Sequence, residues 1–227
     1  MSYFNLTLDT LPPQGVSLII NDGAAVVGQA AVTAAIACSD SPTTGYTMKI
    51  YGDVYDAVKQ NSVALTENDA AWETYSTTKA LTLLGADGSK TIRLKIRDDV
   101  HNTTAEITCT VALDTVVPTV TITGPDVAKI SEQPTKNTSA FTFTADKPFV
   151  NYKVMMVQSI SAVQNTPSNV QIPSDGGSVG MTDSGTFAAN TAVECSVNGT
   201  DLKTAVGGSD GAYIIKVFVF DGVHWSA

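Results

Sequence analysis

The feature that most constrains the fold is an internal repeat. Residues 87–102 (DGSKTIRLKIRDDVHN) align without a gap with residues 210–225 (DGAYIIKVFVFDGVHW). Each copy opens with Asp-Gly, then places apolar residues at every second position, and closes with an Asp and Val-His. This spacing predicts a strand with one buried face, and Asp-Gly favours the turn that leads into it. The chain therefore contains two copies of one β unit.

Further matches indicate where each copy begins. Residues 8–20 (LDTLPPQGVSLII) resemble residues 113–123 (LDTVVPTVTIT), which predicts a domain junction followed by a first strand. Proline is tolerable there because it lies at a strand end. Two weaker matches predict the next strands, which pair residues 32–40 with 139–147, and 47–50 with 152–155.

The repeat predicts an all-β fold with two tandem immunoglobulin-like β-sandwich domains. Two copies of about a hundred residues, with turn signals every 8–12 residues, favour sandwiches over a barrel. The predicted parts are an N-terminal strand or arm over 1–8, domain one over 9–113 and domain two over 114–227. The second copy is longer, and its excess falls near 164–185, a segment rich in Pro, Gly, Ser and Asn that predicts a long loop or an added hairpin. The corresponding region of copy one, 55–75, leaves room for one helical turn.

Composition excludes several partners. The net charge is −9, so nucleic acid and anionic membrane surfaces are not expected partners. The sequence begins without the basic and apolar regions of a signal peptide, and no apolar run reaches the ~20 residues that span a bilayer. Three cysteines are too few for a disulfide framework. We expect three buried thiols without a disulfide between the second and sixth strands, because only Cys38 falls on one of these two strands.

The sequence contains no pattern that predicts catalysis, so we expect no enzyme activity, no cofactor and no metal site. His101 and His224 occupy equivalent loop positions and have no ligand partners at metal-site spacing. Phosphate-binding loops, nucleophile elbows and zinc-protease motifs are absent from the sequence.

Two other features leave alternatives open. The Asp98-Asp99 pair predicts a turn, with a calcium site shared with Asp9 or Asp114 as the alternative. Trp72 is expected to pack on the sandwich, whereas Trp225 is expected to be exposed, and sugar binding through either ring is the alternative.

Several of these residues resemble a known family. Residues 70–83 (AAWETYSTTKALTL), residues 87–102 and the two Leu-Asp-Thr junctions are similar to the bacterial Ig-like repeats of large surface adhesins and phage structural proteins. The resemblance covers copy one almost fully, but only the first strands and the final strand of copy two. Copy one has His101 where the family usually has Gly, and copy two lacks the Trp segment.

The chain ends suggest how the protein assembles. Residues 2–10 (SYFNLTLDT) resemble residues 107–115 (ITCTVALDT), the last strand of copy one, whereas copy two has no counterpart of that strand. An N-terminal strand of a neighbour would fill the resulting groove. Alternation puts three apolar residues on one face of that strand, Phe4, Leu6 and Leu8. In the alternative, the arm lies loose over domain one and copy two closes with fewer strands.

The expected function is structural or adhesive. The resemblance implies a phage tail, baseplate, fibre or head-decoration protein located in the virion, with other virion proteins or copies of itself as partners. Domain two's long segment is expected to contact a partner protein, or a host-surface glycan or protein, through Asn165, Asn169, Asp175 and Asp183. The alternative is a bacterial cell-surface adhesin or a carbohydrate-binding accessory module.

Overall fold

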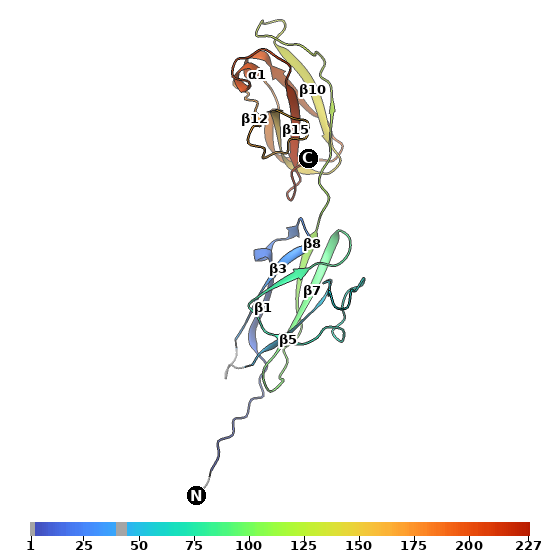
Figure 1. Ribbon diagram of the computed structural model, residues 1–227, viewed down its shortest axis with the longest axis vertical. Coiled ribbons are helices and arrows are strands. Elements are labelled where there is room, and N and C mark those ends of the chain that lie inside the picture. Colours follow the sequence, from blue (N-terminus) through green and yellow to red (C-terminus); the bar gives the residue numbers. More distant parts are fainter. Residues whose placement is uncertain (1–2, 40–44) are drawn as a thin grey trace. The chain divides into compact units, whose positions relative to one another are not determined.

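The computed structural model describes residues 3–39 and 45–227 (Figure 1). Met1 and Ser2 of the predicted arm, and residue 40 at the end of a predicted strand, lie outside the described residues. The chain divides into two compact units, of which the first ends at Thr115 and the second begins at Val116. Strands make up 44% of the structure and helices 5%, which confirms the all-β prediction.

The first unit is a sandwich of two sheets. One sheet has the order β1-β3-β6 and the other the order β2-β8-β7-β4-β5. All pairs are antiparallel except β2 with β8, which run parallel. This is an Ig-like strand order, because β1, β3 and β6 form one sheet and β8, β7 and β4 lie side by side in the other, like strands A, B, E and G, F, C of an Ig domain. The strands are β1 (Gln14–Ile20), β2 (Val26–Val27), β3 (Ala31–Ser39), β4 (Thr47–Gly52), β5 (Glu73–Thr74), β6 (Thr78–Thr82), β7 (Gly88–Arg97) and β8 (Ile107–Leu113).

The core of this unit lies between its sheets. Alternate residues of β7 are buried, among them Ile92, Leu94 and Ile96, each with no exposed surface. They pack in one cluster with Ile36 of the facing sheet and Val111 of β8. The alternation in the repeat therefore predicts the buried face of β7 correctly.

The second unit repeats this plan with changes. One sheet has the order β14-β10-β9, and in the other β11 pairs with β15 on one edge and with β12 and β13 on the opposite edge. A single core joins the two sheets and includes Phe143, Val154 and Val217. The elements are β9 (Val120–Thr123), β10 (Thr138–Ala145), β11 (Phe149–Val157), β12 (Val170–Gln171), β13 (Thr182–Phe187), β14 (Val193–Asn198), α1 (Gly199–Ala205) and β15 (Ile214–Phe220).

Helix α1 was not predicted from the sequence. Its N-cap is Asn198, whose side chain accepts a hydrogen bond from the Thr200 N–H at 2.9 Å. Asp201 follows in the first turn and Lys203 in the last turn, where each charge complements the helix dipole. The Asn198 cap followed by an acidic first turn is the local sequence signal for this helix, which is too short to show a helical period.

Two segments differ from simple loops. Residues 164–185 contain β12 and the start of β13, and they bury Ile172 and Met181 in the core, so this segment is partly built into the sheet. Residues 55–75 form no helix but contain single turns closed by hydrogen bonds, such as that from the Gln60 N–H to the Asp56 carbonyl at 2.7 Å.

None of the three cysteines forms a disulfide. Cys195 is buried, whereas Cys38 and Cys109 are only half-buried, so the expectation of full burial is correct for one of them. Cys38 lies on β3 and the matching strand β7 has no cysteine, as the sequence predicts. Among the described residues, no helix is long and apolar enough to cross a membrane.

Candidate functional site

The candidate site is the edge of β15 that faces away from β11, together with the groove beside its start; we call it the open edge. In the first unit the corresponding strand β7 has a neighbour on each side, β4 and β8. In the second unit β15 pairs only with β11. Within residues 116–227, all of which are described, the hydrogen bonds on its other edge come from the short segment after β15, through the Phe220–Trp225 bridge and the Ser226–Val219 hydrogen bond.

The two copies have the same structure through the turns that follow β7 and β15. Asp98 accepts hydrogen bonds from the Val100 and Asn102 N–H groups, and Asp221 accepts them from the Val223 and His224 N–H groups. In each unit the aspartate thus closes the turn with its carboxylate. These bonds occupy the carboxylate that the calcium alternative requires, and no cluster of three potential metal ligands occurs among the described residues.

A buried hydroxyl follows each turn. The Thr104 Oγ1 accepts a hydrogen bond from the Ile96 N–H at 3.1 Å, and the Ser226 Oγ accepts one from the Val219 N–H at 3.1 Å. In the first unit the chain continues from Thr104 into β8, which covers the rest of β7. In the second unit no described strand covers the corresponding part of β15.

Side-chain burial reveals the effect of the open edge. Positions 213, 215, 217 and 219 share the inward face of β15, and Val217 and Val219 are buried. Ile215 is only half-buried, although its counterpart Ile92 has no exposed surface. The groove end of β15 therefore lacks the apolar cover that β7 has.

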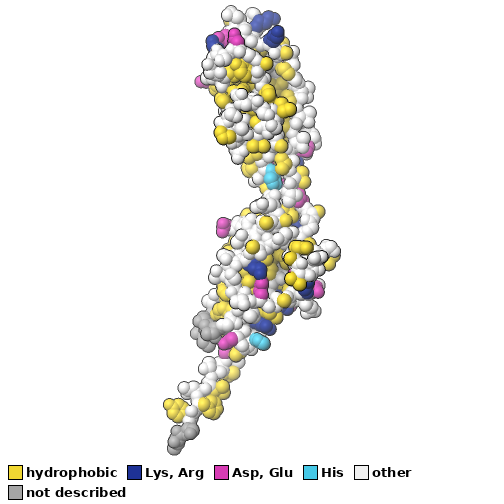
Figure 2. Space-filling view, in the orientation of Figure 1, with side chains coloured by type: hydrophobic (Ala, Val, Ile, Leu, Met, Phe, Trp, Pro, Cys, Tyr) yellow, Lys and Arg dark blue, Asp and Glu magenta, His cyan; other side chains and the backbone are white. Residues whose placement is uncertain are grey.

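A cavity of about 1090 Å³ lies at this end of β15. Its walls come from β9 and the segment after it, from α1 and from residues 208–215. Apolar side chains face it, and two of them are well exposed, Ile122 at 40% and Val127 at 44%. Figure 2 shows hydrophobic side chains at the surface of this unit, with few charges among them.

One ion pair lies at the rim of the groove. Lys203 of α1 forms an ion pair with Glu132 at 2.5 Å, and this hydrogen bond raises the pKa of Lys203. Asp201 is buried below the rim and accepts hydrogen bonds from the Gly176 and Ser178 N–H groups at 2.6 and 2.7 Å. These bonds fasten the segment 174–178 to α1, so the wall of the groove is rigidly supported.

The predicted arm residues are exposed and extended. Phe4, Leu6 and Leu8 are 83–86% exposed, and Tyr3 is 88% exposed. Residues 3–8 form no hydrogen bond with the rest of the described chain. Figure 1 shows this segment running away from the first unit, and Figure 2 shows its hydrophobic side chains at the surface.

The four predicted residues of the 164–185 segment occupy different local settings. Asn165 and Asp175 are exposed, and Asp183 lies on β13, where it accepts a hydrogen bond from the Ser184 N–H. Asn169 is half-buried and donates to the Val163 carbonyl at 2.8 Å, which closes a turn. None of the four lines the groove beside β15, and their predicted role in binding stays a prediction.

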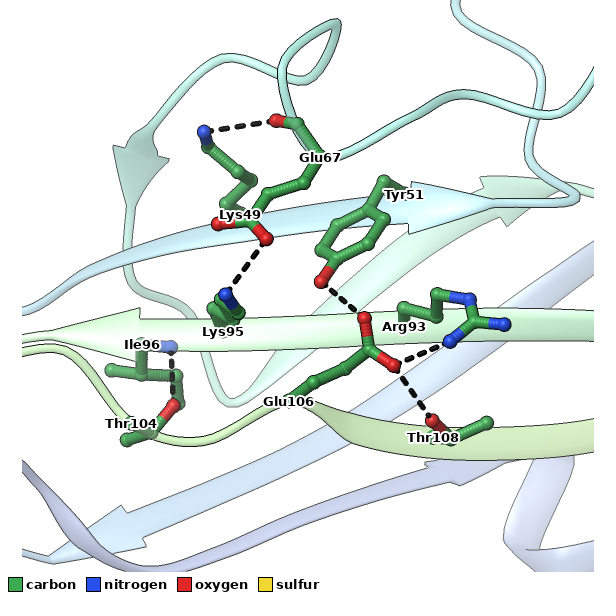
Figure 3. Close-up of polar contacts among 9 residues, drawn as sticks. All are labelled: Lys49, Tyr51, Glu67, Arg93, Lys95, Ile96, Thr104, Glu106 and Thr108. Carbon is green, nitrogen blue, oxygen red and sulfur yellow. Dashed lines mark hydrogen bonds and ion pairs between the residues drawn. The ribbon is translucent and has the colours of Figure 1, made fainter.

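A polar and charged cluster at β4 and β7 of the first unit, completed by Glu67 and by Glu106 just before β8, is a second surface of interest (Figure 3). The Tyr51 hydroxyl donates to Glu106 at 2.6 Å, and Arg93 forms an ion pair with the same carboxylate. These contacts, led by the Tyr51 hydrogen bond, lower the pKa of Glu106. Lys95 pairs with Glu67 at 2.7 Å. The charges thus bind one another within the sheet surface.

Both tryptophans are engaged within the fold. Arg97 lies 4.2 Å and Lys49 5.0 Å from the centre of the Trp72 ring. Trp225 stacks on Phe220 with ring centres 5.3 Å apart and is half-buried, so the expectation that it is exposed is wrong.

Comparison with known proteins gives a limited result. No protein-family model and no curated protein matches the chain. Similar solved structures include fibronectin(III)-like modules of Clostridium thermocellum CbhA, with 14% identity over 93% of this chain and 90% of that one, and a TM-score of 0.45. The chitinase ChiA74 of Bacillus thuringiensis has 13% identity over 93% of this chain and 30% of that one, with a TM-score of 0.34. The FN1–FN3 domains of chicken CNTN1 have 8% identity over 95% of this chain and 63% of that one, with a TM-score of 0.36. The fold assignment rests on the strand order described above.

Proposed function

We propose that this chain is a non-enzymatic structural or adhesive protein of a phage particle, in the tail, baseplate, fibre or head decoration. It acts by assembling through its Ig-like domains with other virion proteins or with copies of itself. The observation that carries this proposal is the open edge of β15. Unpaired backbone groups on a sheet edge form a template for another strand.

The apolar groove strengthens the proposal. Proteins rarely leave a sandwich core uncovered, because each exposed aliphatic side chain forgoes about 1.5–3 kcal/mol of burial. The half-buried Ile215 and the exposed Ile122 and Val127 are three such side chains at one place. A permanent protein partner in a particle would bury them.

The same reasoning ranks the alternative lower. A cell-surface adhesin or carbohydrate-binding module would present an exposed aromatic platform to a sugar. Trp72 is covered by Lys49 and Arg97, and Trp225 is stacked on Phe220. Neither ring is presented in that way.

The test is the location of the protein in the organism that encodes it. We expect mass spectrometry of gradient-purified phage particles to find this chain in a fixed ratio to the major capsid protein. The control is protease shaving of intact, uninduced cells, which should release none of its peptides. Peptides released from the cell surface, together with their absence from particles, would contradict the phage role and favour the adhesin.

A further inference from the structure

We propose that the open edge is filled by residues 3–9 of a second copy of this chain, which pair as an antiparallel strand with residues 210–216, the start of β15 and the four residues before it. This inference rests on the proposed assembly role and names the partner that completes the second unit. Two observations support it: the match between the arm and β8, and the register that this match imposes.

The arm has the side-chain pattern of β8, a strand with no counterpart among the described strands of the second unit. Residues 2–10 align with 107–115, so Leu6 corresponds to Val111 and Leu8 to Leu113. In β8 these two positions are 1% and 3% exposed, because they fill the core of the first unit. In the arm the corresponding leucines are 86% and 85% exposed. The arm thus has the core residues of a last strand without a core to place them in.

The register of the first unit predicts where the arm would lie. In the first unit Cys109 lies opposite Ile92, Val111 opposite Lys90 and Leu113 opposite Gly88. When the repeat is superposed, those three β7 positions become Ile215, Tyr213 and Gly211.

The same superposition places the arm in the cavity. Phe4 would then face Ile215, Leu6 would face Tyr213, and Leu8 would lie beside Gly211. Ile215, Tyr213 and Gly211 all line the cavity. The register comes from strands β7 and β8 of the first unit, whereas the cavity lies in the second unit. The residues that the register places opposite the arm are residues that line the cavity.

The chemistry of the arm also fits the groove. Residues 3–8 carry no charge, so they bring no unpaired charge into the apolar groove. At the rim of the groove, Lys203 is already paired with Glu132. A strand of seven residues spans about 23 Å, which matches the seven residues 210–216 that the register places opposite the arm.

The arm and the link to the second unit are anchored at opposite ends of β7 in the first unit. The Asn102 side chain donates to the Asp9 carbonyl at 3.4 Å, so the arm leaves the first unit at the end of β7. Thr115, the last residue of the first unit, is bonded to Asp87 at the start of β7. Crosslinking, described below, distinguishes a second copy from the same chain as the donor of the arm.

A contact of this kind joins different surfaces of two copies. It must close into a ring or continue as a filament, because each copy offers one arm and one open edge. We therefore expect the purified full chain to form a closed dimer or a larger assembly at high concentration.

The test compares two single substitutions in the full chain. Leu6→Asp places a charge on the inward face of the arm, whereas Asn5→Asp places the same charge on the next residue, which corresponds to the exposed Thr110. Multi-angle light scattering across a concentration series should show assembly for the intact chain and for Asn5→Asp. Leu6→Asp should weaken association by at least 10- to 100-fold, the loss expected for one buried leucine.

Crosslinking tests the register. A benzoylphenylalanine at position 4 should crosslink between chains to residues 211–215, and one at position 5 should give much less of this product. The inference is overturned if the intact chain is monomeric at all concentrations, if Leu6→Asp assembles as well as Asn5→Asp, or if the crosslink forms within one chain. These outcomes do not depend on particle location: a chain that assembles but is absent from particles would refute only the phage role.

Discussion

The contact between Asp201 and the segment 174–178 allows a quantitative prediction for the second unit. Asp201 is 1% exposed, and its two carboxylate oxygens accept from the Gly176 and Ser178 N–H groups. Asp201→Asn keeps the shape of the side chain but replaces one acceptor oxygen with an NH₂ group. One buried N–H then loses its partner and faces another donor. Hydrogen bonds to charged groups contribute about 1.5–3 kcal/mol, so we expect a loss of about 2–4 kcal/mol in the free energy of unfolding.

The assay uses the tryptophans. The chain has two, Trp72 in the first unit and Trp225 in the second. On a Trp72→Phe background, fluorescence during urea unfolding reports only the second unit. Asp183→Asn is the matched control, because the exposed Asp183 accepts only from the neighbouring Ser184 N–H. If Asp201→Asn lies within about 0.5 kcal/mol of this control, the typical effect of a surface substitution, then the two bonds do not support the unit.

The same contact predicts a pH dependence. Burial raises the pKa of Asp201, but the hydrogen bonds from Ser178 and Gly176 outweigh burial and hold the pKa below its usual value. A carboxylate with a depressed pKa contributes stability that is complete above its unfolded pKa of about 4 and is lost as pH falls through the folded pKa. The difference in unfolding free energy between the intact chain and Asp201→Asn should therefore shrink as pH falls from 7 toward 2.

Three further changes test other parts of the fold. Gly52→Ala should destabilise the first unit by more than about 2 kcal/mol, because Gly52 has φ +97° and a Cβ there would lie 2.2 Å from the Thr91 carbonyl oxygen; a melting temperature equal to that of the intact chain would contradict this. Burial raises the pKa of Cys195 to about 12, so a thiol reagent should modify Cys195 only after unfolding, and native reaction at the rate of the other two thiols would refute this. Thr104→Val removes the acceptor of the Ile96 N–H and should cost about 1–3 kcal/mol by urea unfolding of the first unit, whereas a neutral result would show that water replaces the hydroxyl.

The repeat predicts much of the fold because alternation and burial have the same physical origin. Positions 92, 94 and 96 are buried as the period of two requires, and so are 217 and 219. Residues 32–39, 47–50 and 152–155 lie on strands, as their weaker matches predict. These elements follow from local pattern alone.

Other features depend on contacts that local pattern does not encode. Helix α1 has only seven residues and is held by its cap and by the loop bonded to Asp201, so it leaves no helical period in the sequence. The β12 and β13 strands in the segment 164–185 form only because β11 offers them an edge. The burial of Trp225 follows from its stack on Phe220, which the tight turn at Asp221 creates.

The sequence predicts the arm of the candidate site but not the groove. The match of residues 2–10 with β8 indicates the donor face, and Phe4, Leu6 and Leu8 are exposed in the structure. The acceptor groove needed the structure, because its walls come from β9, α1 and β15, which are distant in sequence. The residues chosen on the 164–185 segment remain a prediction.

Hydrogen–deuterium exchange at β15 tests the central claim most directly. Along β15, half of the backbone N–H groups point away from β11 and have no strand to bond in a single chain. If an arm fills the open edge, peptides covering residues 211–220 should exchange slowly in the intact protein and in Asn5→Asp, and faster in Leu6→Asp. Equal exchange of these peptides in all three proteins would contradict the claim that the open edge receives the arm.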